Sequence, residues 1–126
     1  MRLGAISWSA ALVCVALLLA GCGHAVHARR GGVVRVAVME YRLRPDDIIA
    51  RAGTITLVAR NLGRLSHNLA VTATGANARI LAATRPIPPG ASRTLVVTLR
   101  PGRYGLASMI QSDESLGDRG TLTITR

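Results

Sequence analysis

From Val33 to the end of the chain, apolar and polar side chains alternate with a period of two and show no helical period. Because successive side chains of a strand point to opposite faces, this pattern predicts strands that are buried on one side. The candidate strands are short, and Gly, Pro, Asn or Asp bounds each of them. Clear examples are Thr54–Arg60, Thr94–Leu99 and Thr121–Thr125. We therefore expect an all-β domain over residues 33–126, a β-sandwich of about seven strands.

Three local patterns refine this expectation. The alternation changes phase after Val38, which predicts a bulge or a bend within one strand. A strand over Ser66–Val71 would carry His67 on the same face as its apolar residues. The segment Leu99-x-Pro-Gly-x-Tyr104 resembles a tyrosine corner, in which the hydroxyl binds upstream backbone and fixes a crossover between sheets. Tyr104 is therefore expected to have a structural role.

The N-terminus carries a targeting signal. Arg2 precedes an apolar run over Ala10–Ala20, about half the length that a spanning helix needs, which predicts a signal peptide over residues 1–21. The run ends in Leu-Ala-Gly-Cys22, which resembles the bacterial lipobox, whose Cys is diacylated and then becomes the first residue. The resemblance implies a lipoprotein anchored through Cys22 to the cell membrane, on its extracytoplasmic face. Residues 22–32 are expected to form the lipidated Cys and a flexible tether.

This processing would remove Cys14 and consume the thiol of Cys22, so the mature chain would hold no free thiol, disulfide or cysteine metal ligand. Two histidines of the tether, His24 and His27, fit either a solvated linker or a metal-binding tract. Arg29 and Arg30 are placed to contact anionic head groups beside the lipid.

The charge balance is strongly positive, with 16 basic residues against 6 acids and a net charge of +10. All basic residues are Arg, which fits the codon bias of a GC-rich genome. Binding of nucleic acid by base stacking needs exposed aromatic rings, and the domain offers only Tyr41 and Tyr104. We expect no nucleic-acid partner. Because no catalytic spacing and no phosphate-binding loop is present, we also expect no enzyme activity.

Several motifs occur in order along the domain. They are Val38–Asn61, Gly63-x-x-x-His67-Asn-Leu, Pro89-Gly90-Ala-Ser-x-Thr and the segment ending at Tyr104. Together they resemble the cupredoxins, the family of plastocyanin and azurin. The resemblance implies a Greek-key β-sandwich with a copper site at one end. It also implies that His67 stands at the position of the first histidine ligand.

The last loop departs from the family pattern, which places a Cys, a His and a Met there. This chain has Ser108 at the Cys position, Asp113 at the His position and Asp118 at the Met position. Type-1 copper requires a thiolate together with two imidazoles. The resemblance therefore implies a domain without a type-1 site, which acts as a binding or accessory module for a protein of the cell envelope.

Three interpretations of this position stay open. In the first, the site binds no cofactor, and His67 hydrogen-bonds Asp113 or Ser108. In the second, His67 and both aspartates form a re-tuned site for a divalent metal, because such ligands suit zinc, manganese or iron. In the third, copper is retained through softer groups, with thioethers from Met39 and Met109 beside the imidazole. Either of the last two would make the protein a metal-binding or electron-transfer protein that uses a rebuilt site around His67.

Overall fold

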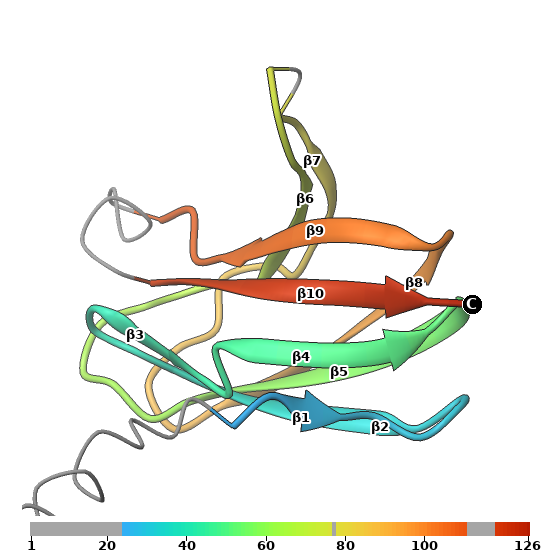
Figure 1. Ribbon diagram of the computed structural model, residues 1–126. Coiled ribbons are helices and arrows are strands. Elements are labelled where there is room, and N and C mark those ends of the chain that lie inside the picture. Colours follow the sequence, from blue (N-terminus) through green and yellow to red (C-terminus); the bar gives the residue numbers. More distant parts are fainter. Residues whose placement is uncertain (1–23, 77, 111–117) are drawn as a thin grey trace, which may run out of the picture.

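The computed structural model describes residues 24–76, 78–110 and 118–126, and these form two β-sheets packed face to face (Figure 1). The smaller sheet has four strands in the order β3-β2-β5-β8. β2 pairs with β5 in parallel and with β3 in antiparallel orientation, and β8 covers the other edge of β5. The bounds of these strands are Val33–Met39 for β2, Arg42–Arg44 for β3, Gly53–Asn61 for β5 and Ser92–Leu99 for β8.

The larger sheet has six strands in the order β1-β4-β10-β9-β6-β7. β4 runs parallel to both β1 and β10, whereas the remaining pairs are antiparallel. The chain passes repeatedly between the sheets, so the predicted all-β sandwich is confirmed. No helix long and apolar enough to cross a membrane occurs in the described part of the chain. The bounds are Val26–His27 for β1, Asp47–Arg51 for β4, Ala70–Ala73 for β6, Ile80–Ala83 for β7, Gly102–Ala107 for β9 and Arg119–Thr125 for β10.

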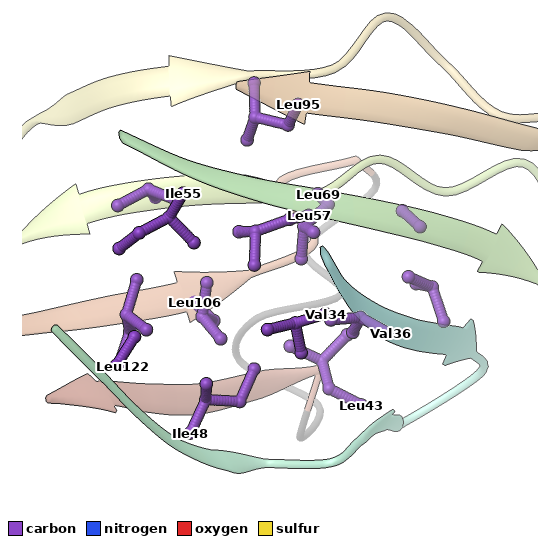
Figure 2. Packing of buried hydrophobic residues seen from close by; sticks show 14 of the residues in the cluster. Val34, Val36, Leu43, Ile48, Ile55, Leu57, Leu69, Leu95, Leu106 and Leu122 are labelled. Carbon is purple, nitrogen blue, oxygen red and sulfur yellow. The ribbon is translucent and has the colours of Figure 1, made fainter. Parts of the chain in front are cut away.

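The core lies between the sheets and consists of aliphatic side chains from both inner faces (Figure 2). Leu57 of β5 and Leu122 of β10 are both fully buried, one from each sheet. Burial of a side chain of this size contributes about 1.5–3 kcal/mol, so aliphatic residues can hold the domain without a Phe or Trp. Both sheets, and the core residues of the part of the chain that the structure describes, lie within residues 24–126.

The predicted bulge after Val38 is wrong, because the chain makes a tight turn there. β2 ends at Met39, Glu40 and Tyr41 form the turn, and β3 runs back beside β2. Tyr41 has a φ of 63°, in the left-handed region that tight turns use. A two-residue turn shifts the alternation between the two strands just as a bulge within one strand would. The sequence pattern therefore could not separate the two.

Two further boundaries differ from the predictions. The predicted tether contains β1, which pairs with β4, and the Ala28 N–H donates to the carbonyl of Ile49 at 2.8 Å. A strand of two exposed residues has no alternation for sequence reading to detect. The strand predicted from Ser66 begins only at Ala70, because His67 makes an isolated bridge to Ile87 of a different segment.

Tyr104 lies where the chain crosses from one sheet to the other. β8 of the smaller sheet ends at Leu99, and β9 of the larger sheet begins at Gly102. The half-buried Tyr104 donates a hydrogen bond from its hydroxyl to the carbonyl oxygen of Arg100 at 2.9 Å. The ring packs against the core at the same time. The side chain therefore ties the crossover to the body of β9.

Candidate functional site

One end of the sandwich gathers the turn after β2, the loop after β5, the end of β9 and the start of β10, which lie at the left of Figure 1. His67 stands at the centre of this end and is fully buried. Its backbone is fixed by Ile87, whose N–H donates to the His67 carbonyl at 2.7 Å and whose carbonyl accepts from the His67 N–H at 3.3 Å. The imidazole is thus held by backbone bonds on a segment outside any regular strand.

The loop that leads to His67 is organised from within by Asn61, a fully buried residue at the end of β5. Its Oδ1 accepts from the N–H of Gly63 at 2.8 Å. Its Nδ2 donates to the carbonyls of Leu65 and Ile87, both at 2.7 Å. Because every buried polar group needs a partner, this amide fixes the path of the loop.

The two ring nitrogens of His67 face two different carboxylates. Nδ1 lies 3.5 Å from Oδ2 of Asp118, whose side chain is fully buried. Nε2 lies 3.5 Å from Oε1 of Glu40, whose side chain is 27% exposed. The bonding directions of the two imidazole nitrogens diverge, so these carboxylates lie at different edges of the ring. His67 thereby links the turn after β2 with the start of β10.

The carboxylate of Glu40 accepts hydrogen bonds from backbone N–H groups of the loop after β5. Its Oε1 accepts from the N–H groups of Arg64 at 2.5 Å and Leu65 at 2.7 Å. Hydrogen bonds lower the pKa of Glu40 from 4.5 to about 2. The bond from the Leu65 N–H makes the largest contribution to this shift, and the contact with His67 adds to it. A Cβ on Gly63 would stand 2.6 Å from Glu40 Oε2, so only glycine leaves room for the carboxylate here.

Ser108 directly follows β9 and is fully buried. Its Oγ accepts from the backbone N–H of Asn68 at 3.3 Å. The side chain of Asn68 completes the link, since its Oδ1 accepts from the N–H of Met109 at 2.7 Å. The Ser108 N–H also donates to the backbone carbonyl of Asp118 at 2.9 Å. The hydroxyl is therefore part of a hydrogen-bonded junction between three segments.

Of the residues that the sequence singled out, the structure brings His67, Ser108 and Asp118 to one place. Asp113 and Cys22 lie outside the described residues. Tyr104 belongs to the crossover between the sheets. Sequence reasoning missed Glu40, which precedes His67 by many residues and follows no ligand pattern; only the Gly at position 63 hinted at a close approach.

Within residues 24–76, 78–110 and 118–126, no group of three or more His, Cys, Asp or Glu side chains is placed to hold a metal ion. For the two carboxylates beside His67, the orientation of the imidazole explains why they form no such group. A metal ion bound at Nδ1 could reach Asp118, whereas an ion at Nε2 could reach Glu40. The two carboxylates consequently cannot join the imidazole on a single ion.

Comparison with known proteins agrees with this architecture. The family model of the cupredoxin-like domain matches residues 9–124, so the chain belongs to the family of cupredoxin-like domains. The predicted family resemblance is thereby confirmed. None of the curated protein sequences matches the chain.

Several solved structures share the fold. Dithionite-reduced auracyanin from Roseiflexus castenholzii superposes with a TM-score of 0.70 at 20% identity, over 78% of this chain and 100% of that one. Auracyanin A, a "blue" copper protein from Chloroflexus aurantiacus, gives 0.63 at 15% identity, over 75% and 100%. Rusticyanin from Thiobacillus ferrooxidans gives 0.62 at 13% identity, over 79% and 80%. At such identities the likeness establishes the fold and leaves the chemistry to this chain's own residues.

Proposed function

We infer that this protein is a lipid-anchored, extracytoplasmic lipoprotein whose cupredoxin-like domain lacks a type-1 copper site and acts as a binding or accessory module rather than as an enzyme. The observation that carries the inference is the buried hydroxyl of Ser108 beside His67. This hydroxyl stands where the resemblance to the cupredoxins puts the copper-binding thiolate.

The donor set does not fit a blue copper ion. Such a site needs one thiolate and two imidazoles around the metal. The described part of this site supplies one imidazole, from His67, and no thiolate. The oxygen of Ser108 is a hard donor, and it already accepts a hydrogen bond from the backbone of Asn68. Electron transfer through a type-1 centre is therefore not part of the proposed function.

The same contacts favour a binding role for this end of the domain. His67, Glu40 and Asn68 join segments from both sheets through hydrogen bonds and close contacts between imidazole and carboxylate groups. A fixed backbone presents its loop side chains in one arrangement, which lowers the entropic cost of holding a partner. We propose a protein of the cell envelope as that partner.

Copper titration of the purified domain tests the loss of the type-1 site. We expect no intense visible absorption band at one equivalent of Cu²⁺, in the wild type or in a His67→Ala variant. A blue protein with one copper per chain, whose colour disappears in His67→Ala, would contradict the proposal. Asp46→Ala, which removes an exposed carboxylate from the turn between β3 and β4, is the matched control.

Mass spectrometry of the full chain, expressed in a bacterium and recovered from its membranes, tests the anchor. The lipobox predicts a mature N-terminus at Cys22 with a diacylglyceryl group on the thiol. Cys22→Ser should abolish the lipid, whereas Cys14→Ser should retain it, because Cys14 lies in the segment that is removed. An unmodified Cys22 in the membrane fraction would overturn this part of the proposal.

A second candidate is a rebuilt site for a divalent metal, using His67, Asp118 and Asp113. It is favoured by the buried Asp118 carboxylate, 3.5 Å from the imidazole Nδ1. Isothermal titration with Zn²⁺, Mn²⁺ and Cu²⁺ would then show one site that is lost in His67→Ala and in Asp113→Ala. Binding that neither substitution affects would exclude this candidate.

A further inference from the structure

The outer face of the four-stranded sheet carries a cluster of arginines. Along β2, β3 and β5, buried residues alternate with exposed ones, so the exposed positions all point away from the core. Four of these outward positions are arginines, and they are Arg35, Arg42, Arg44 and Arg60. The sequence scatters them over three strands, and only the strand register brings them together.

The register sets three of the arginines around one small residue. Ala37 of β2 pairs with Arg44 of β3 on one side and with Arg60 of β5 on the other. Arg35 lies two positions before Ala37, on the same face. Neighbouring strands are about 4.8 Å apart, so the three guanidinium groups can converge on one ligand. They line a shallow groove of about 300 Å³ that Val58 and Ser92 complete.

Nothing on these strands neutralises the cluster. β2, β3, β5 and β8 contain no Asp or Glu, so the charged side chains that these strands place on the face are all positive. The carboxylate of Asp46, after β3, shares a separate groove with Arg42 and Arg44. Arginine binds phosphate through two parallel N–H donors, and this geometry makes it the preferred residue for phosphate recognition. The chemistry of the groove therefore suits a surface that presents many phosphates.

Exposed aliphatic residues accompany the arginines. Val33 of β2 and Val96 of β8 pair with the same residue of β5, Thr56, on the outward face, and they are 53% and 59% exposed. Leu62, which is 56% exposed, lines the groove beside Arg60. Aliphatic groups among cationic ones are typical of surfaces that lie on a membrane, where head groups bind the charges and the acyl boundary accepts the apolar atoms.

The position of the N-terminal segment supports an orientation in which this basic face lies towards the membrane. His24 lies in a groove with Arg42 and Arg44, directly beside β3. Cys22 is two residues further, and two extended residues span at most about 7 Å. A lipid on Cys22 would thus hold β3, the edge strand of the basic face, close to the bilayer surface.

We propose that the outer face of the four-stranded sheet docks onto the anionic phospholipid surface, with Arg35, Arg44 and Arg60 binding lipid phosphates. That the protein is located at this membrane rests on the proposed lipid anchor. The affinity of the face for anionic phospholipids does not depend on that anchor. The anchor and the face would together fix the orientation of the domain relative to the bilayer.

Vesicle co-sedimentation of residues 24–126 tests the face without the lipid. The probes are phosphatidylcholine vesicles with and without phosphatidylglycerol, at low and high salt. Each arginine near an anionic surface contributes about 1 kcal/mol, or about fivefold in partitioning. We therefore expect Arg35→Gln/Arg60→Gln to weaken binding to the anionic vesicles by about 25-fold. Arg51→Gln/Arg103→Gln removes the same charge from the outer face of the other sheet and should reduce binding by less than about fivefold.

Equal losses in the two variants would overturn the proposal, because they would reflect net charge alone. Equal binding of the wild type to neutral vesicles would also overturn it. A wild type that ignores anionic vesicles but binds polyglutamate would assign the face to an acidic protein instead. Circular dichroism checks that each variant is folded, and the state of Cys22 is measured separately on the full chain. A failed anchor and a failed face are thereby distinguished.

Discussion

At the scale of single residues, the imidazole of His67 determines how the candidate site is built. Its two nitrogens face carboxylates from different parts of the chain, at 3.5 Å each. Asp118 occupies a position that the family pattern indicates, and its participation could be predicted from the sequence. Glu40 could not be predicted, because its contact depends on a turn that folds β3 back on β2 and on the backbone donors of the loop after β5.

Glu40 makes the stability of the domain depend on pH in a specific range. Its folded pKa of about 2 lies below the ordinary 4.5, so the unfolded chain binds the proton more readily. The stabilisation is present above about pH 4.5 and is lost as the pH falls towards 2. In urea unfolding at a series of pH values, Glu40→Gln should flatten this decline.

The control for this effect is Asp46→Asn, which removes an exposed carboxylate outside the loop. Its pH profile should keep the decline that the wild type shows. If Glu40→Gln and the wild type lose stability in parallel between about pH 4.5 and 2, the hydrogen bonds to the Glu40 carboxylate do not cause the decline in stability.

At the scale of elements, short connections with buried polar side chains hold the strands in place. Asn61 makes three hydrogen bonds to the loop and to Ile87, and the loop in turn supplies the donors for Glu40. The strand Gly53–Asn61 was predicted almost to the residue, because its alternation is long and uninterrupted. The turn after β2 and the short β1 were not, since neither has a pattern that distinguishes it from its alternatives.

Replacement of Asn61 by Asp tests how strongly this amide holds the loop. Asp has the same shape but places an acceptor against the carbonyls of Leu65 and Ile87, so two buried donor bonds are lost. Each buried group left unsatisfied costs about 1–3 kcal/mol, and we expect Asn61→Asp to lower the free energy of unfolding by about 3 kcal/mol or more. Chemical denaturation measures this loss.

The control is Ser92→Asp, which adds the same charge at an exposed site nearby and should change the free energy of unfolding by about 0.5 kcal/mol at most. Equal losses of stability in Asn61→Asp and Ser92→Asp would refute the role of the Asn61 amide.

The hydroxyl of Tyr104 gives a second prediction for a connection. Tyr104→Phe keeps the ring in the core and removes only the bond to the Arg100 carbonyl. A single neutral hydrogen bond contributes about 1 kcal/mol, and thermal unfolding should detect its loss as a lower melting temperature. Tyr41→Phe removes the same hydroxyl from a side chain that is 62% exposed and should leave the melting temperature unchanged. The reverse order of the two variants would contradict the assignment of Tyr104 to the crossover.

At the scale of the whole molecule, the two sheets share one aliphatic core but differ in their outer faces. For the long strands, such as β2 and β5, the sequence could predict which residues face inwards, because their burial alternates along the strand. It could not predict that Arg35, Arg44 and Arg60 meet around Ala37, since this depends on a parallel pairing of β2 with β5. The positive net charge of the sequence did not by itself indicate a function. The strand register shows that several of the arginines behind it lie together on one surface.

Because a single core supports both sheets, its central side chains should control the stability of the entire domain. Leu57 lies between Val34 of β2 and Leu95 of β8, and all three point inwards towards the other sheet (Figure 2). Leu57→Ala should cost about 2–5 kcal/mol, a large part of the 5–15 kcal/mol typical of a domain. Urea unfolding followed by circular dichroism should show one transition at a lower midpoint, because neither sheet can stay folded without the other. Val96→Ala on the outer face should shift the midpoint little. Two separate transitions in Leu57→Ala would show that the sheets unfold independently and that the core is not shared.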